Sequence, residues 1–177
     1  MAHRLDYRVM LEEALVEARL GLAEGGLPVG AALFDEAGRL IGRGRNRRVQ
    51  DQDPSMHAAV NAFRNAGRRK DYAGTVLALT QAPCWFCSGL VRQFGIATVV
   101  VGDVAHGRGG LSWLKRHGVK IVEVKSPACE ELLDRFILAQ PGLWEEDQGL
   151  APDSVRVAVS GPTDVQPKKR AKQNIFL

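Results

Sequence analysis

The stretch TVLALTQAPCWFCSGLVRQFGIATVVV, residues 75–101, decides the fold. Its two ends, 75–80 and 98–101, are short apolar runs rich in β-branched residues, and each predicts a buried strand. Between them, Pro83 opens a helix that Gly95 closes. A strand, a helix and a second strand in succession form the unit from which α/β proteins are built.

The sequence on either side of this stretch adds three strands and further helices. Residues 6–24 repeat apolar side chains at helical spacing, with charged residues such as Glu17 between them. Residues 28–34 and 39–43 predict a hairpin, and 46–56 predict a loop. The other predicted elements are helices over 57–66, 111–117 and 127–139 and a strand over 119–124. This alternation predicts a three-layer α/β/α sandwich around a central mixed five-stranded sheet.

Length and charge predict one domain followed by a basic extension. The 177 residues are 45% hydrophobic and 25% charged, as in an ordinary globular domain. We expect a domain over residues 1–150 and an extension over 151–177 that packs on the core or on a partner chain. The extension carries five basic and two acidic side chains, so only about +1 of the net charge of +4 belongs to residues 1–150. A nearly neutral domain argues against a nucleic acid partner.

The chain contains no run of about 18 apolar residues and no signal-peptide pattern at its start. We therefore expect a cytoplasmic protein with no membrane partner. The three cysteines, Cys84, Cys87 and Cys129, do not make the even-numbered set of a disulfide scaffold. In a reducing compartment the close pair indicates metal binding or redox activity.

The strongest chemical signal combines His57 with the pair Cys84 and Cys87. Two cysteines three residues apart at a helix start lie on one face, and the helix N-terminus favours the thiolate that binds metal. His57, at the start of the preceding predicted helix, can supply a third ligand. Three protein ligands leave one tetrahedral position open for water, as in catalytic zinc sites, whereas structural zinc sites usually have four ligands.

The cysteine pair has two other interpretations. A thioredoxin-like redox pair would follow the first strand of a βαβ unit and would not need His57. A closed structural zinc site would need a fourth ligand, and His106, His117 and Cys129 are available without belonging to a second paired motif. Cys129 is better interpreted as a core residue on the apolar face of its helix.

The arrangement H-x-E followed by P-C-x-x-C is the signature of zinc-dependent nucleobase deaminases. The chain has His57-Ala58-Ala59 and then Pro83-Cys84-Trp85-Phe86-Cys87, so Ala59 stands where the signature has glutamate. On these motifs the chain resembles the fungal-type cytosine deaminases, within the cytidine-deaminase-like superfamily, over roughly residues 8–149. The further motifs that carry this resemblance are Glu24–Gly30, Gly42–Asn46, Tyr72–Pro83, Phe94–Ile96 and Trp144–Gly149.

The resemblance implies the cytidine-deaminase-like fold, a Zn²⁺ ion held by His57, Cys84 and Cys87, and a homodimer that packs helices of the zinc-bearing layer together. It also implies a free nucleobase as the small-molecule substrate. The residues that would contact this base are Asn46, Ala58, Ala82, Trp144 and Asp147.

Each of these base contacts has an implied role. Asn46 would hydrogen-bond the ring carbonyl or a ring nitrogen, and Asp147 would accept a hydrogen bond from the exocyclic amine. Trp144 would form an aromatic wall, while the backbone around Ala58 and the carbonyl of Ala82 would line the pocket. An aromatic residue that the family carries after the fourth strand has no counterpart here. Either His106 takes that place or the pocket is larger, which leaves another amino-substituted heterocycle as an alternative to cytosine.

The implied reaction is hydrolysis of cytosine to uracil and ammonia. In the family, the glutamate two residues after the histidine transfers the protons, which Ala59 cannot do. Losing a general acid–base group typically costs about 10²–10⁴ in rate. The otherwise intact site favours a catalytic-knockout variant of an active enzyme over a natural non-catalytic relative, and the sequence leaves both open.

Rival functions follow from the same motifs. A guanine deaminase would need a roomier pocket. A tRNA adenosine deaminase would need an open basic groove, and the neutral domain and the cap formed by Trp144 and Asp147 argue against it. A zinc-dependent protein that captures a base without turnover would account for Ala59 directly.

Overall fold

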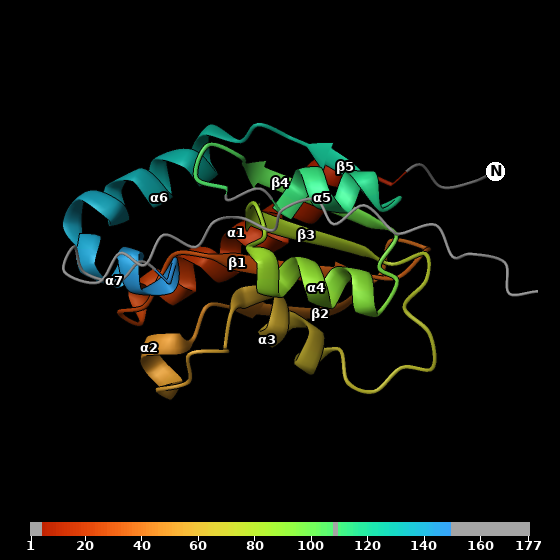
Figure 1. Ribbon diagram of the computed structural model, residues 1–177, viewed down its shortest axis with the longest axis horizontal. Coiled ribbons are helices and arrows are strands. Elements are labelled where there is room, and N and C mark those ends of the chain that lie inside the picture. The colour runs from red at the N-terminus through yellow and green to blue at the C-terminus, as the bar shows by residue number, and fades with distance from the viewer. Residues whose placement is uncertain (1–4, 108–109, 150–177) are drawn as a thin grey trace, which may run out of the picture.

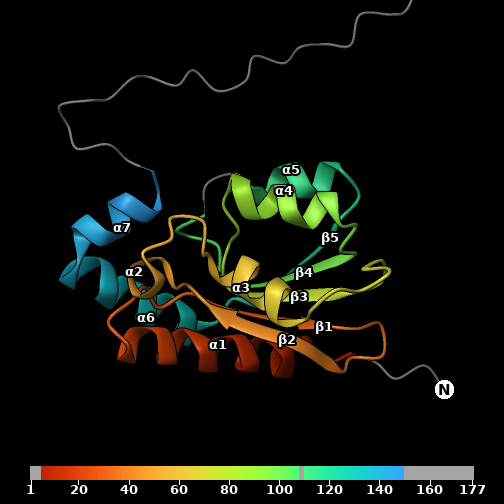
Figure 2. The same ribbon diagram turned by 90° about the horizontal axis from the view of Figure 1, so that it is seen from below.

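A computed structural model describes residues 5–107 and 110–149 of the chain. In that part, a five-stranded sheet lies between two layers of helices (Figures 1 and 2). The strands are β1 (Gly30–Phe34), β2 (Leu40–Arg45), β3 (Val76–Gln81), β4 (Thr98–Asp103) and β5 (Lys120–Glu123). The helices are α1 (Tyr7–Ala23), α2 (Arg48–Asp51), α3 (Ala58–Asn65), α4 (Trp85–Gln93), α5 (Gly110–Arg116), α6 (Pro127–Ala139) and α7 (Pro141–Asp147).

The sheet is mixed, with the strand order β2-β1-β3-β4-β5. β1 is antiparallel to both β2 and β3, whereas β3, β4 and β5 run parallel. Parallel neighbours need a crossover, and α4 supplies it between β3 and β4, as the stretch 75–101 predicts. The predicted three-layer sandwich with a mixed five-stranded sheet is therefore confirmed.

Successive strand residues alternate between the two faces of the sheet. On β3, Leu77 and Leu79 pack in one core cluster with residues of α3, α4 and α5. Val76 and Ala78 pack in a second cluster with residues of α1 and α6. Figure 2 shows the same division, with α1 and α6 on one side of the sheet and α3, α4 and α5 on the other. The layer that contains α3 and α4 is the one that carries the cysteine pair.

Two local expectations differ from the structure. The predicted loop 46–56 contains the short helix α2. Helix α6 ends at Ala139 as predicted, and Pro141 lies in the first turn of the next helix, α7, where a proline loses no helical hydrogen bond. Cys84 is the N-cap of α4 and not a residue of its first turn. Helix α7 brings the chain back to the end of the sheet at which the cysteines lie.

The extension predicted over 151–177, and its packing on the core or a partner, lie outside the described residues. Among the helices that are described, none has the length and apolar character needed to cross a membrane.

Gly30 marks the closest approach of α1 to the sheet, and we expect Gly30→Ala to destabilise the protein by about 1–3 kcal/mol or more. A Cβ at this position would meet the carbonyl oxygen of Ala14 and, at 2.6 Å, the amide nitrogen of Ala18. These are backbone atoms, so α1 itself would have to move. Urea denaturation measures the loss.

The matched control is Gly89→Ala, on α4. A Cβ at Gly89 has no neighbour within 4 Å, and alanine favours a helix by up to about 1 kcal/mol over glycine. We expect this variant to keep or raise the free energy of unfolding. Equal stabilities of the two variants would contradict the close packing of α1 on β1.

Candidate metal centre

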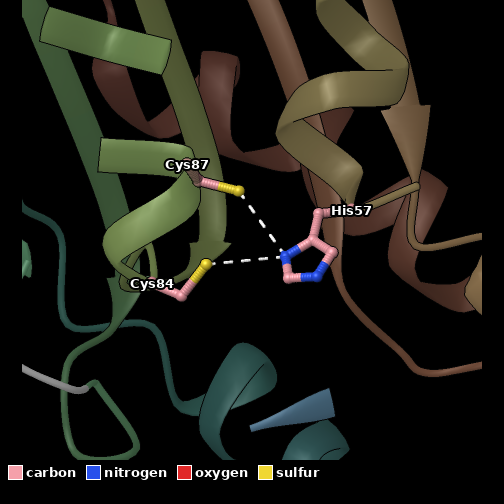
Figure 3. A group of neighbouring side chains, drawn as sticks. All are labelled: His57, Cys84 and Cys87. Atoms are coloured by element: carbon pink, nitrogen blue, oxygen red, sulfur yellow. Dashed lines mark hydrogen bonds between the residues drawn. The ribbon is translucent and has the colours of Figure 1, made fainter. Parts of the chain in front are cut away.

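The ends of two neighbouring helices hold the predicted ligands. His57 is the N-cap of α3, and Cys84 is the N-cap of α4, with Cys87 in the first turn of that helix. The N-terminal ends of α3 and α4 lie side by side, so the three side chains point toward one another (Figure 3). The strand β3 ends just before Cys84, which fixes this ligand at the carboxyl end of the parallel strands.

The distances among the three ligand atoms fit a zinc ion. Nδ1 of His57 lies 3.5 Å from Sγ of Cys84 and 3.7 Å from Sγ of Cys87. Tetrahedral zinc, with bonds of about 2.3 Å to sulfur and about 2.0 Å to nitrogen, keeps such donors about 3.5 Å apart. One imidazole and two thiols are also the donor set that zinc prefers over magnesium or calcium.

The protonation of the cluster also suits a cation. A hydrogen bond with Cys87, opposed by burial and reinforced by His57, lowers the pKa of Cys84 to about 4. The same bond and burial raise the pKa of Cys87. Burial lowers the pKa of His57, but the hydrogen bond with Cys84 and the charge of Asp147 outweigh it, and the net pKa is raised. The cluster thus keeps a thiolate at neutral pH, which is the form that binds metal.

The alternative of a closed structural site finds no support in the described part of the chain. There the metal-ligating cluster consists of His57, Cys84 and Cys87. Cys129 is 3% exposed in the core against α1 and the sheet, as predicted. His117 follows α5, and its Nδ1 donates to the carbonyl oxygen of Trp113 in that helix over 2.8 Å. His106 contacts two carboxylates away from this cluster, as described below.

A small cavity opens beside the three ligands. Ala59 is 2% exposed and lines it one residue beyond Ala58, in the first turn of α3. The other lining residues include predicted base contacts and several that were not predicted. They are Val29, Asn46, His57, Leu79, Gln81, Ala82, Pro83, Cys84, Cys87, Asp147 and Gln148. A side chain longer than alanine at position 59 would therefore extend toward the ligands and the cavity.

Asn46 and Asp147 meet across this cavity although 101 positions separate them. Nδ2 of Asn46 donates to Oδ1 of Asp147 over 2.8 Å. The same oxygen accepts from Nη1 of Arg48 at 3.2 Å, and Oδ2 accepts from Gln148 at 3.1 Å. The bonds from Asn46 and Arg48 hold the end of α7 against the cavity and fix the Asp147 carboxylate beside the metal ligands.

Arg48 is a site residue that the sequence did not reveal. Its side chain is 9% exposed, and that of Asp147 is 7% exposed, so this ion pair is largely shielded from water. The guanidinium also reaches Glu146 at 3.2 Å and the carbonyl oxygen of Pro54 at 3.1 Å. Arg48 follows Asn46 closely, but its position in a predicted loop, after several other arginines, gave no indication of its partner in α7.

Trp144 and His106 lie next to each other and outside the set of residues that line the cavity. Their rings are perpendicular, with centroids 6.1 Å apart. His106 lies 2.9 Å from Asp103 through Nδ1 and 3.2 Å from Asp134 through Nε2. The buried carboxylate of Asp103 requires a partner, and His106 provides it. Contact of Trp144 or His106 with a base stays a prediction.

Comparison with known proteins agrees with this site. Residues 5–103 match the family model described as the cytidine and deoxycytidylate deaminase zinc-binding region. A cytosine deaminase of Candida albicans is 32% identical over 146 residues, which cover 81% of this chain and 97% of that protein. A tRNA-specific adenosine deaminase of Haemophilus influenzae is 35% identical over 96 residues, covering 52% of this chain and 56% of that protein.

Solved structures give the same fold. A structure from studies of A-to-I editing by tRNA:A34 deaminases superposes with a TM-score of 0.63 at 25% identity, covering 71% of this chain and 99% of that chain. The guanine deaminase of Nitrosomonas europaea superposes with a TM-score of 0.65 at 23% identity, covering 75% of this chain and 85% of that chain. At that identity the second likeness supports the fold alone.

Proposed function

This chain belongs to the cytidine and deoxycytidylate deaminase family, and we propose that it is a zinc-dependent cytosine deaminase whose proton-transfer position is occupied by Ala59. The observation that carries the proposal is the cavity shared by the metal ligands, Asn46 and Asp147. An amide and a carboxylate opposite a metal centre offer the donor and acceptor needed to orient a planar amino-heterocycle.

A free pyrimidine base is favoured over larger substrates. The Candida cytosine deaminase matches over nearly its whole length, whereas the Haemophilus tRNA deaminase matches over 56% of its length. The cavity is small and pairs apolar Val29 and Leu79 with polar Asn46 and Asp147, which suits a neutral ring. The tRNA-specific adenosine deaminases among the similar proteins make a purine the competing substrate.

When bound to His57, Cys84 and Cys87, zinc would supply a Lewis acid that activates water for attack on the carbon bearing the amino group. Asn46 would hold the ring and Asp147 the exocyclic amine. In the structure these two side chains bond to each other at 2.8 Å, so a base would replace that bond with its own polar groups. Arg48, whose Nη1 lies 3.2 Å from Oδ1 of Asp147, holds this carboxylate in place during the exchange.

The reaction also requires two proton transfers. The water oxygen becomes the new carbonyl oxygen, and the two water protons end on the ring nitrogen and on the amine, which leaves as ammonia. The methyl group of Ala59 lies in the cavity but cannot move a proton. We infer that this chain binds a base and does not turn it over at an appreciable rate.

Binding of cytosine to the zinc-loaded chain tests the cavity directly. We expect Asp147→Asn to lower the affinity for cytosine by about 10- to 100-fold, because a hydrogen bond to a charged group contributes about 1.5–3 kcal/mol to binding. Isothermal titration calorimetry measures the two affinities. Glu145→Gln is the matched control, because this substitution removes one negative charge from an exposed position of α7. Equal affinities of all three proteins would contradict the assignment of Asp147.

We also propose that the chain forms a homodimer through the layer that contains α4. Trp85 and Phe86 on this helix are 56% and 53% exposed next to the metal ligands. Large apolar side chains grouped on a surface mark interaction sites. Sedimentation equilibrium, which compares the mass in solution with the 19.3 kDa of one chain, tests this part of the proposal.

A further inference from the structure

A second cavity lies at the opposite ends of the two helices that carry the metal ligands. His57 and Cys84 precede α3 and α4, whereas this cavity is formed where the two helices end. Its walls come from the end of α3, from the loop 66–75 that leads to β3, and from Phe94 after α4. The loop runs along the lower right of the molecule in Figure 1. The second cavity is therefore separate from the site proposed to bind a base.

Arginines dominate the polar part of this cavity. Arg64, Arg68 and Arg69 line it, Lys70 follows directly, and residues 64–70 contain no acidic side chain. In the described part of the chain, none of these four cations forms an ion pair with a carboxylate. Nε of Arg69 is buried, and no described protein group accepts its hydrogen bond. A buried donor of this kind calls for an acceptor.

Aromatic rings form the floor beneath the arginines. Phe63 stacks on Tyr72 with ring centroids 4.5 Å apart and lies 4.4 Å from Phe94. Phe94 remains 44% exposed, so part of its ring is open to a ligand. The hydroxyl of Tyr72 donates to the carbonyl oxygen of Gly67 over 2.7 Å, which ties the arginine-bearing loop to the aromatic floor.

Neutralisation of the C-terminal end of α3 explains only part of this arrangement. Arg64 lies in the last turn of the helix, where a cation is favourable. Arg68 and Arg69 lie beyond the helix, on the loop, where the helix dipole has fallen off. Arg68, Arg69 and Lys70 are consecutive in the chain, and like charges that close repel one another. An anion bound among them would relieve this repulsion and accept the hydrogen bond of Arg69.

We propose that this cavity binds the phosphate group of a nucleotide, with the guanidinium groups of Arg68 and Arg69 on the phosphate and the exposed ring of Phe94 against the base. Guanidinium groups match phosphate through paired hydrogen bonds. Aromatic side chains stack on bases with little sequence preference. The nucleotide phosphate can come from a free mononucleotide or from an RNA chain. The proposal does not rest on the proposed deaminase function.

The test uses the full zinc-loaded chain, with and without saturating cytosine, and variants of residues outside the first cavity assign the binding to the second cavity. Cytidine monophosphate, cytidine, inorganic phosphate and a short single-stranded RNA are titrated separately. We expect the monophosphate to bind at least tenfold more tightly than cytidine. We expect the double variant Arg68→Ala/Arg69→Ala to bind the monophosphate at least tenfold more weakly. We expect Phe94→Ala to lower the affinity for the monophosphate but not the affinity for inorganic phosphate.

Matched variants separate a specific site from general charge. Lys115→Ala/Arg116→Ala removes the same charge from the exposed face of α5 and should leave the affinity unchanged. Arg69→Lys keeps the positive charge and serves as the test variant if Arg68→Ala/Arg69→Ala does not fold. It should still weaken nucleotide binding, because lysine cannot form the paired hydrogen bonds of a guanidinium group. If RNA alone binds, and only with Arg68 and Arg69 present, the phosphate site stands with RNA as its source. The proposal would be overturned if the loop variant and the α5 variant lost the same affinity. It would also be overturned if neither the monophosphate nor RNA bound at millimolar concentration.

Discussion

Ala59→Glu is expected to release ammonia from a free base at least about 10²- to 10⁴-fold faster than the present chain. Residue 59 lies in the first turn of α3, two residues after His57, and lines the cavity with the metal ligands. A glutamate there would extend into the space that Asn46 and Asp147 border. One carboxylate could then take a proton from water and deliver protons to the ring nitrogen and to the departing amine. Because one group would serve several steps, the gain should reach the upper end of this range.

The measurement is ammonia release from cytosine, guanine, adenine and their nucleosides. Ala59→Gln is the matched control, because glutamine has nearly the same shape as glutamate but cannot transfer a proton. Release from cytosine by the glutamate variant alone would establish both the substrate and the role of position 59. Release from guanine or adenine instead would reassign the substrate. No release from any base, with one zinc per chain, would leave a base-binding protein or an untested heterocycle.

The central part of the fold could be predicted because its signals are local. Pro83 and Gly95 delimit α4, and the apolar runs on either side can be buried only as adjacent strands. The ligand spacing of Cys84 and Cys87 is fixed within one helical turn, so the sequence alone places both sulfurs together. His57 required one further inference, that the start of the preceding helix lies near the cysteine pair, and in the structure the three ligand atoms lie within 4.8 Å of one another.

Pairs that are distant in sequence could not be predicted in the same way. Glu17 falls among the charged residues between the apolar positions of α1, which suggests exposure, but it is 5% exposed. Its carboxylate accepts from Arg45 at 2.6 Å, because the end of β2 lies over α1. The pair of Arg48 and Asp147 likewise depends on α7 returning to α2. A periodic pattern specifies which face of a helix is apolar, but it cannot specify which distant cation neutralises a buried carboxylate.

Removal of zinc is expected to lower the midpoint of thermal unfolding by about 8–16 °C. A ligand held at 1,000 times its Kd stabilises the folded state by about 4 kcal/mol. For a domain of this size each kcal/mol moves the midpoint by about 2–4 °C. The physical cause lies in the cluster: without a cation, the partly buried thiolate of Cys84 depends on hydrogen bonds from the thiol and backbone amide of Cys87 and from the imidazole of His57. Differential scanning calorimetry with and without a strong chelator measures the shift.

Cys87→Ala should abolish both the bound zinc and the chelator-dependent shift, because two protein ligands cannot hold the ion against a chelator. Cys129→Ala is the matched control. Cys129 is as buried as Cys87, at 3% against 5% exposed, but packs on the α1 side of the sheet. Its variant should unfold at a lower temperature through lost packing and still carry one zinc per chain. Metal analysis by mass spectrometry separates the two effects, and zinc retained by Cys87→Ala or lost by Cys129→Ala would contradict the assigned ligands.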